Sequence, residues 1–176
     1  MQILKSLSAA FVASVLAISS TPAVAQQQAP ERPQIITQFD QLMVTYLLQD
    51  VQATWTVETD AQGNTNYRAS AEGGINFTLA PRACSEQSGC LGMMMLAVFT
   101  GVNAPSMTEL DAFLNRLNDT SGTIKVFRNA QGVVVLQEYM NAAGGISYRN
   151  AQAQLYVFGE DIVAVSRALA QFERGG

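Results

Sequence analysis

The sequence predicts an α+β domain: a twisted antiparallel sheet flanked by helices, with elements in the order α-β-β-β-α-β-β-α. Three stretches place apolar residues at spacings of three and four, which is typical of amphipathic helices. The stretches between them alternate apolar and polar residues, as strands do. The expected strands come in groups and do not alternate with helices, which favours an α+β over an α/β arrangement. At 176 residues the chain is long enough for one such domain with its own core.

The first expected elements are a helix over residues 35–49 and a strand over residues 53–59. In the helix, apolar residues recur on one face. Thr37 is the expected N-cap, with Asp40 three residues further on as in a capping box. In the strand, tryptophan and valine alternate with threonine and glutamate, which indicates a half-buried position in the sheet.

The next expected strand runs from Asn66 to Leu79 and is interrupted by Gly73 and Gly74. A glycine pair inside a strand indicates a bulge, a sharp bend or the close approach of another backbone. A ligand-binding loop is the alternative, although the pair lacks the G-x-G-x-x-G spacing of phosphate-binding loops and has no lysine nearby. We therefore treat both glycines as a structural motif.

Cys84 and Cys90 are the two cysteines of the chain, and the short polar loop SEQSG separates them. In an exported protein, two cysteines this close in sequence most simply form a disulfide. Closing so short a loop stabilises the fold by about 2 kcal/mol on the chain-entropy estimate. The spacing excludes a C-x-x-C redox pair, and a metal site would need ligands from elsewhere in the chain.

Residues 91–99 are apolar at almost every position, which predicts a central strand covered on both faces. Met93 and Met95 lie within it. Packing in the core is one interpretation of these methionines. The other is a binding surface, because flexible methionine side chains adapt to varied partners.

The second half of the chain predicts a helix, a hairpin and a long final helix. Ser106 is the expected N-cap of the first of these helices, with Glu109 completing a capping box. The hairpin covers residues 123–140 and turns at residues 129–132, Asn-Ala-Gln-Gly. These signals are local in sequence, so each element is predicted independently of the others.

Gly144 and Gly145 end the hairpin, and Ser147 is the expected N-cap of a helix that runs to about Phe172. An apolar stripe with alternating spacings of three and four follows this helix. The stripe either packs on the sheet or forms the contact between two copies of the chain. With the two methionines it makes up the candidate partner surface, namely Met93, Met95, Leu155, Phe158, Ile162, Val165 and Leu169.

The first 25 residues have the pattern of a secretory signal peptide. Lys5 precedes a short apolar run, and an Ala-Val-Ala sequence ends at Ala25. The apolar run is shorter than the roughly 20 residues needed to span a bilayer, which argues against a membrane anchor. Residues 26–34 are polar and proline-containing and are expected to be a disordered lead-in to a domain over residues 35–173. The mature chain is thus expected in the periplasm or outside the cell, without a membrane span.

Composition excludes several classes of function. The chain contains no histidine, so Ser-His and Cys-His nucleophile pairs and imidazole metal sites are excluded. Its net charge is −4, and removal of Lys5 with the signal peptide makes it more acidic. An acidic chain with few lysines argues against a nucleic-acid partner, which needs a clustered basic surface. No cofactor-binding motif is found, and we expect none.

The chain resembles the YbjN-domain family of bacterial sensory transduction regulators from residue 35 to the final helix. The motifs that carry the resemblance are Gly73-Gly74-Ile75-Asn76-Phe77-Thr78, Cys84, Leu114-Asn115-Arg116, Val135-Leu136 and Gly144-Gly145-Ile146-Ser147. The resemblance implies a fold similar to type III secretion chaperones, which are often dimeric. It implies no catalytic residue.

Three functions are compatible with these observations. The favoured one is a non-enzymatic periplasmic protein that binds another protein or modulates envelope signalling and stress regulation, with a homodimer as a further option. The alternative is a small-molecule-binding module with a pocket between the sheet and the final helix, lined by Trp55, Phe77 and Tyr139. An enzyme that uses carboxylates and an arginine is disfavoured; its candidate residues are Glu72, Glu138 and Arg149.

Overall fold

The computed structural model describes residues 31–175 of the chain. The expected signal peptide and most of the expected lead-in lie outside the described residues. The described part contains three α-helices, which are α1 (Gln41–Asp50), α2 (Met107–Thr120) and α3 (Tyr148–Glu173). No helix within residues 31–175 is long and apolar enough to cross a membrane.

The strands form one six-stranded antiparallel sheet with the order β2-β3-β4-β5-β7-β6. They are β2 (Thr54–Thr59), β3 (Thr65–Ala71), β4 (Ile75–Ser85), β5 (Gly89–Phe99), β6 (Lys125–Arg128) and β7 (Val134–Asn141). A separate two-residue pair joins β1 (Ile35–Ile36) to β8 (Ile146–Ser147). The predicted α+β class with an antiparallel sheet is confirmed.

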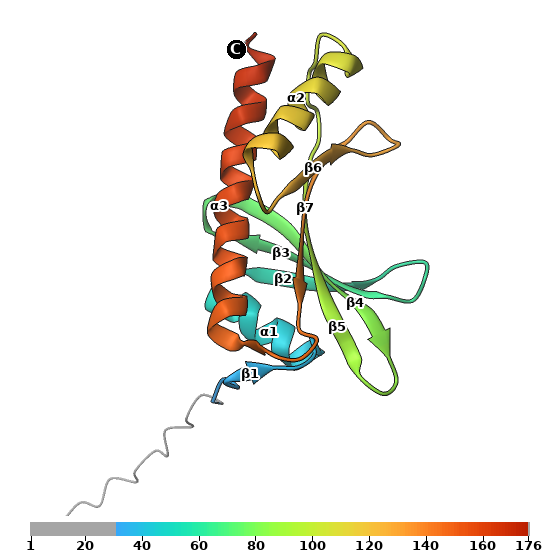
Figure 1. The fold of residues 1–176 in the computed structure, drawn as a ribbon, viewed down its shortest axis with the longest axis vertical. Coiled ribbons are helices and arrows are strands. Elements are labelled where there is room, and N and C mark those ends of the chain that lie inside the picture. The colour runs from blue at the N-terminus through green and yellow to red at the C-terminus, as the bar shows by residue number, and fades with distance from the viewer. Residues whose placement is uncertain (1–30, 176) are drawn as a thin grey trace, which may run out of the picture. The chain divides into compact units, whose positions relative to one another are not determined.

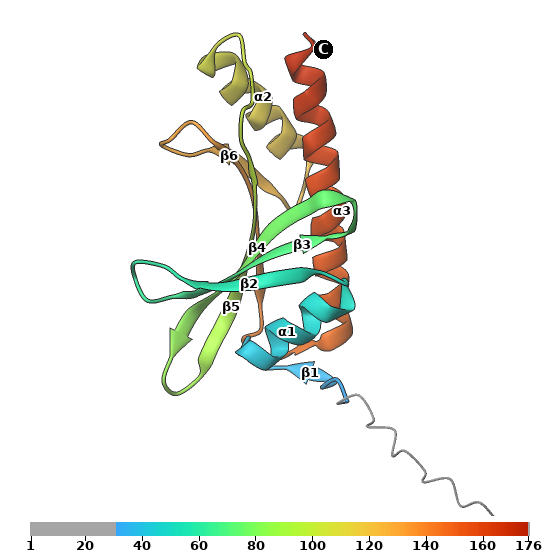
Figure 2. The same cartoon turned by 180° about the vertical axis from the view of Figure 1, so that it is seen from behind.

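All three helices pack on the same face of the sheet, which we call the helix face (Figure 1). Phe158 of α3 contacts Phe77 of β4 edge-on, with ring centroids 6.3 Å apart. Arg128 of β6 reaches Asp111 of α2 with a 2.8 Å ion pair. As Figures 1 and 2 show, α1 lies beside the first turns of α3 and α2 beside its last turns. The core therefore lies between one face of the sheet and the three helices.

The sheet has one strand more before α2 than predicted, because the glycine pair forms a turn. Residues 66–79 were predicted as one interrupted strand, but β3 and β4 pair with each other antiparallel, Tyr67 opposite Leu79. A short 3₁₀ turn over Glu72–Gly74 joins them. Gly73 and Gly74 both have φ of 76°, a left-handed conformation that glycine adopts without steric cost. The order of the main elements is α-β-β-β-β-α-β-β-α.

The first helix begins later than predicted. Its N-cap is Asp40, whose carboxylate accepts a hydrogen bond of 2.8 Å from the backbone N–H of Met43, so the prediction of Thr37 is wrong. Aspartate is the stronger N-cap of the two residues. The preceding residues Ile35 and Ile36 pair instead with β8, which holds them extended.

The other predicted helix starts and the second hairpin are confirmed. Ser106 Oγ and Ser147 Oγ each accept a 3.2 Å hydrogen bond from a backbone N–H three residues on, at the starts of α2 and α3. Between β6 and β7, the side chain of Asn129 accepts hydrogen bonds from the backbone of Gln131 and Val133 at 3.0 and 2.9 Å. Local side-chain-to-backbone bonds of this kind are set by nearby sequence, which is why they were predictable.

Candidate functional site

The residues of the expected partner surface all lie in the core. Met93 and Met95 are fully buried on the helix face of β5, and the α3 stripe is buried against the sheet. These side chains are at most 6% exposed in this conformation, which favours core packing over a partner surface. The buried set is Met93, Met95, Leu155, Phe158, Ile162, Val165 and Leu169. Of the two interpretations of the stripe, packing on the sheet is the one the structure has.

No helix within residues 31–175 covers the opposite face of the sheet, and we call it the open face. Strand β5 was expected to be covered on both sides, but its side chains Met94, Leu96 and Val98 point to the open face. Val98 is 57% exposed, and Tyr139 on the neighbouring strand β7 is 49% exposed. Val135 and Phe127 continue the same face across β7 and β6, since Val135 lies opposite both Val98 and Phe127. The open face is therefore apolar over three adjacent strands.

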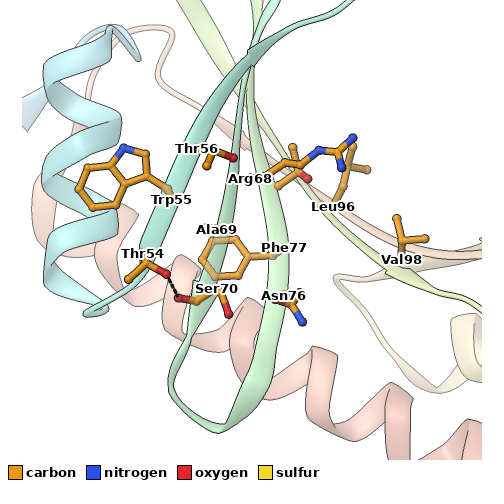
Figure 3. A pocket seen from close by; sticks show the side chains of 11 residues that line it. Thr54, Trp55, Thr56, Arg68, Ala69, Ser70, Asn76, Phe77, Leu96 and Val98 are labelled. Atoms are coloured by element: carbon orange, nitrogen blue, oxygen red, sulfur yellow. Dashed lines mark hydrogen bonds between the residues drawn. The ribbon is translucent and has the colours of Figure 1, made fainter.

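A groove of about 640 Å³ follows the open face where β2, β3, β4 and β5 curve together (Figure 3). We call it the open-face groove. On the open face its lining combines the aliphatic side chains of Leu96 and Val98 with hydroxyl, amide and guanidinium groups. Trp55, Ala69 and Phe77 lie in the same strands, but their register places these side chains on the helix face. The lining residues are Thr54, Trp55, Thr56, Arg68, Ala69, Ser70, Asn76, Phe77, Thr78, Leu96 and Val98. Apolar surface beside hydrogen-bonding groups is suited to a polypeptide segment, which has both kinds of group.

Arg68, Arg82 and Lys125 are basic residues on the open face. Arg68 of β3 forms a 2.8 Å ion pair with Glu58 of the neighbouring strand β2, and both side chains are well exposed. Arg82 donates to the Asn66 side chain at 3.0 Å. Lys125 lies over the ring of Phe127 with 5.2 Å to its centroid. The open face thus carries basic groups on a chain that is acidic as a whole.

A second cavity, of about 470 Å³, lies on the helix face. The end of α1, the β3–β4 turn and the middle of α3 surround it. We call it the helix-side cavity. Phe77, Leu155 and Phe158 are among its apolar lining residues, and Asp50, Glu72, Tyr156 and Glu160 are among its polar ones. Its position matches the pocket expected between the sheet and the final helix.

Only one of the three residues expected to line that pocket does so. Phe77 lines the helix-side cavity, whereas Trp55 is on the helix face of β2, packs against the core and does not reach this cavity. Tyr139 points to the open face and lines neither this cavity nor the open-face groove. The alternation of side chains along a strand places Tyr139 and the buried Met140 on opposite faces of β7, which explains the error.

The two glycine pairs occupy turns and not ligand loops of the phosphate type. Gly73 and Gly74 line a third cavity of about 400 Å³, between the β3–β4 turn and the α3 residues Ser166 and Arg167. Gly144 and Gly145, with φ of 80° and 94°, form the turn that ends β7. A Cβ atom at Gly145 would stand 3.0 Å from Ile35, so this glycine also permits the β1–β8 contact.

Cys84 and Cys90 form a disulfide at the end of the β4–β5 hairpin. The two residues are direct cross-strand partners. The carbonyl of Cys90 also accepts a 2.7 Å hydrogen bond from the backbone N–H of Phe39, just before α1. The disulfide therefore closes the end of the hairpin beside the segment that leads into α1.

Glu138 of β7 is a carboxyl group on the helix face, which is otherwise apolar around it. Its cross-strand neighbour is Met95, and no described hydrogen-bond donor reaches Glu138 Oε1. Burial, and then the nearby carboxyl of Asp161 on α3, raise the pKa of Glu138 to about 7. A carboxyl in this position favours its protonated form, which can share its proton with the second carboxylate.

A comparison with protein families decides the classification. The model of the YbjN family, described as "Putative bacterial sensory transduction regulator", matches residues 41–171, most of the chain. The chain belongs to the YbjN family. No curated protein and no solved structure shows a significant match to it. The likeness to type III secretion chaperones that the sequence resemblance implied stays an expectation.

The description of the YbjN family names a putative regulator, and YbjN is not a known enzyme family. In this member, Glu72 lines the helix-side cavity, while Glu138 and Arg149 line none of the three cavities described above. The candidate catalytic trio is therefore not brought together. Within residues 31–175 no group of three or more acidic or cysteine side chains is placed to hold a metal ion.

Sequence reasoning missed two features of this YbjN-family protein. The first is the open face, whose side chains were assigned to a strand covered on both sides. The second is Gly159, which lines the helix-side cavity from the middle of α3. The available signal was a glycine inside a strongly periodic helix. Such a glycine costs about 1 kcal/mol relative to alanine, which indicates a packing or functional reason for its presence.

Proposed function

We propose that this YbjN-family protein is a non-enzymatic, exported regulator that acts by binding another protein on the open face of its sheet. The observation that carries the proposal is the open face itself: Leu96, Val98 and Tyr139 lie on adjacent strands with no helix over them. Single exposed apolar residues are ordinary, but a contiguous apolar patch rimmed by polar groups is typical of protein-binding surfaces.

The chemistry of the open face favours a polypeptide with acidic groups. Hydroxyl and amide groups of the open-face groove can bond to a backbone, while apolar side chains take its alternate residues. Arg82 is paired with Asp60 at 3.8 Å, whereas Lys125 forms no ion pair within residues 31–175 and adds positive charge at the same face, which favours an acidic group of the partner through complementary potentials.

Export is supported by the signal-peptide pattern of residues 1–25 and by the disulfide. Disulfides such as Cys84–Cys90 persist in oxidising compartments, including the bacterial periplasm, and are rare in the cytosol. A regulator in this location is placed to respond to the state of the cell envelope.

The test compares two valine substitutions of similar exposure. Val98→Glu places a charge on the open face, and Val157→Glu places the same charge on the outer side of α3, where Val157 is 47% exposed. Periplasmic crosslinking and complementation of an envelope phenotype of the deletion strain are measured for both. We expect Val98→Glu to lose the crosslinked species and complementation, and Val157→Glu to keep them.

Equal behaviour of the two folded variants would contradict docking on the open face. Failure of the deletion strain to show any envelope phenotype, together with no crosslinked partner, would contradict the regulatory proposal. A crosslinked species with the mass of two chains identifies a second copy as the occupant, which is the homodimer option.

The helix-side cavity favours a second function, the binding of a small molecule. Its volume of about 470 Å³ is within the range of small-ligand sites, and its lining is mainly apolar with a few polar groups. A ligand bound only to the folded state raises Tm by mass action, so a thermal-shift screen of small compounds tests this function.

A further inference from the structure

The helix-side cavity has a preformed apolar floor. Its lowest layer is the edge-on pair of Phe77 and Phe158, with ring centroids 6.3 Å apart, which the core holds almost fully buried. The half-buried side chains of Val51, Ile75 and Val163 cover this layer and form the apolar surface of the cavity. An aliphatic or aromatic group of a ligand can be desolvated here without rearrangement of the fold.

Gly159 keeps one wall of the cavity open. It lies inside the 26-residue helix α3, where the backbone is helical and needs no glycine. A Cβ atom placed at Gly159 meets no atom within 4 Å, so packing does not require glycine either. Alanine favours a helix interior over glycine. The structural effect of this glycine is therefore the space that it leaves in the cavity.

The polar groups of the cavity are acidic. Asp50, Glu72 and Glu160 line it, and none of its thirteen described lining residues is basic. Asp50 is already bound to Arg32 at 3.1 Å. Within residues 31–175, neither Glu72 nor Glu160 forms an ion pair. The nearest cavity along α3, which shares Ile75 and Val163, contains the one arginine in this region, Arg167.

We propose that the helix-side cavity binds a small cationic amphiphile, a molecule with a protonated amine and an apolar body. The apolar body packs on Val51, Ile75 and Val163, above the buried Phe77 and Phe158, and the ammonium group lies beside the carboxylates of Glu72 and Glu160. The inference rests on the small-molecule function proposed above and specifies the charge and the shape of its ligand. An anionic amphiphile is excluded by the same carboxylates, because like charges at the rim repel it.

The probe is n-octylammonium below its micelle-forming concentration, with n-octyl sulfate and ethylammonium as matched comparisons. Isothermal titration calorimetry of the mature protein at pH 7 measures binding. We expect n-octylammonium to bind at least tenfold more tightly than either comparison, because only it has both the chain and the positive charge.

Three variants and a charge control separate the two parts of the site. Glu72→Gln combined with Glu160→Gln is expected to weaken n-octylammonium binding about five- to tenfold, since both countercharges are exposed and each contributes modestly. Gly159→Leu is expected to abolish binding by filling the cavity. Gly159→Ala keeps binding, because its methyl group meets no atom within 4 Å. Glu86→Gln, in the β4–β5 turn away from the cavity, is the matched charge control and leaves binding unchanged.

Circular dichroism establishes that each variant is folded before titration. Equal binding of n-octyl sulfate and n-octylammonium overturns the cationic class, as does an unchanged affinity in the Glu72/Glu160 variant. Undiminished binding to folded Gly159→Leu overturns the location. Absence of n-octylammonium binding at millimolar concentration overturns the inference, whereas the broader small-molecule function is overturned only by a negative thermal-shift screen that includes neutral and anionic compounds.

Discussion

At the scale of single residues, Glu138 is a carboxyl group whose ionisation is coupled to the fold. It lies on the helix face of β7, flanked along the strand by the buried Leu136 and Met140. Charging it there removes a carboxylate from water and places it beside Asp161. The folded protein therefore holds a proton on Glu138 at pH values where the unfolded chain has released it.

This coupling predicts a stability that falls as pH rises. Glu138 has a pKa of about 7 in the folded protein against an ordinary value of 4.5, so unfolding between these pH values releases a proton. Its contribution is fully present below pH 4.5 and is lost as pH rises through about 7. Glu138→Gln should raise the free energy of unfolding at pH 8 by about 1–2 kcal/mol relative to wild type, with little change at pH 4.5.

Urea unfolding at several pH values between 4.5 and 8 measures this difference. Glu86→Gln is the control, since Glu86 is exposed in the β4–β5 turn and its removal should leave the pH profile unaltered. A Glu138→Gln profile parallel to wild type across this range would show that Glu138 is not the group responsible.

Single-residue features were predictable where they depend on neighbouring sequence. Ser106 and Ser147 were assigned correctly as N-caps because an N-cap bonds to a backbone N–H only three residues away. The environment of Glu138 was not predictable, because the group that faces it, Asp161, belongs to an element more than twenty residues further along the chain. Thr37 was chosen over Asp40 because the pairing of β1 with β8 is likewise invisible in local sequence.

At the scale of elements, hairpins account for most of the sheet. The β6–β7 hairpin was predicted from the sequence, whereas the β3–β4 hairpin was not. The β6–β7 hairpin was predicted because Asn129 and the following glycine make a recognisable turn. The β3–β4 hairpin was taken for one bent strand, because a glycine pair permits both a bend and a turn. The choice depends on whether Tyr67 and Leu79 pair across the turn, and that pairing is a tertiary contact.

The disulfide of the β4–β5 hairpin gives a prediction at this scale. Replacing both Cys84 and Cys90 with alanine should lower the free energy of unfolding by about 2 kcal/mol, because the closed loop is short. The fold should persist, since the strands stay paired from Thr78 with Leu96 to Arg82 with Gly92. Urea unfolding of the variant, and of wild type with and without a reductant, measures the loss.

Reductant should shift the wild-type midpoint and leave the double alanine variant where it is. A matched pair of substitutions in the same turn is Ser85→Ala with Ser88→Ala, which removes an exposed 2.7 Å hydrogen bond between the two hydroxyl groups and should cost at most about 0.5 kcal/mol. Two reactive thiols in the unreduced mature protein, or a midpoint insensitive to reductant, would contradict a stabilising disulfide.

At the scale of the whole domain, the fold is two-layered, with helices on one side only. The sequence of β5 conceals this asymmetry, because both of its faces are apolar: Met93 and Met95 lie in the core, while Leu96 and Val98 lie on the open face. A covered strand and an apolar binding surface have the same composition. The two cases differ only in where the three helices pack. The open face could therefore not be predicted from the sequence of β5.

Asp50, the last residue of α1, joins Arg32 before α1 to the first turns of α3. Its carboxylate accepts hydrogen bonds from Arg32 at 3.1 Å, from the Tyr148 hydroxyl at 2.6 Å and from Gln152 at 3.2 Å. The Tyr156 hydroxyl bonds to the Asp50 backbone carbonyl at 2.9 Å. Burial first, and then the bond to Asp50, raise the pKa of Tyr148 above its ordinary value, so its hydroxyl stays a donor. One carboxylate thereby joins segments about a hundred residues apart.

Removing this carboxylate should destabilise the whole domain more than removing one from an exposed pair. Asp50→Ala leaves the Tyr148 hydroxyl without its acceptor and Arg32 without its countercharge in a partly buried site, and the expected loss is about 2–3 kcal/mol. Glu58→Ala breaks the pair with Arg68, whose side chain is 68% exposed, and should cost at most about 1 kcal/mol. Urea unfolding of both variants at pH 7 measures the difference. Equal losses would mean that Asp50 acts as an ordinary surface charge, and that the packing of α1 and α3 alone holds the segments together.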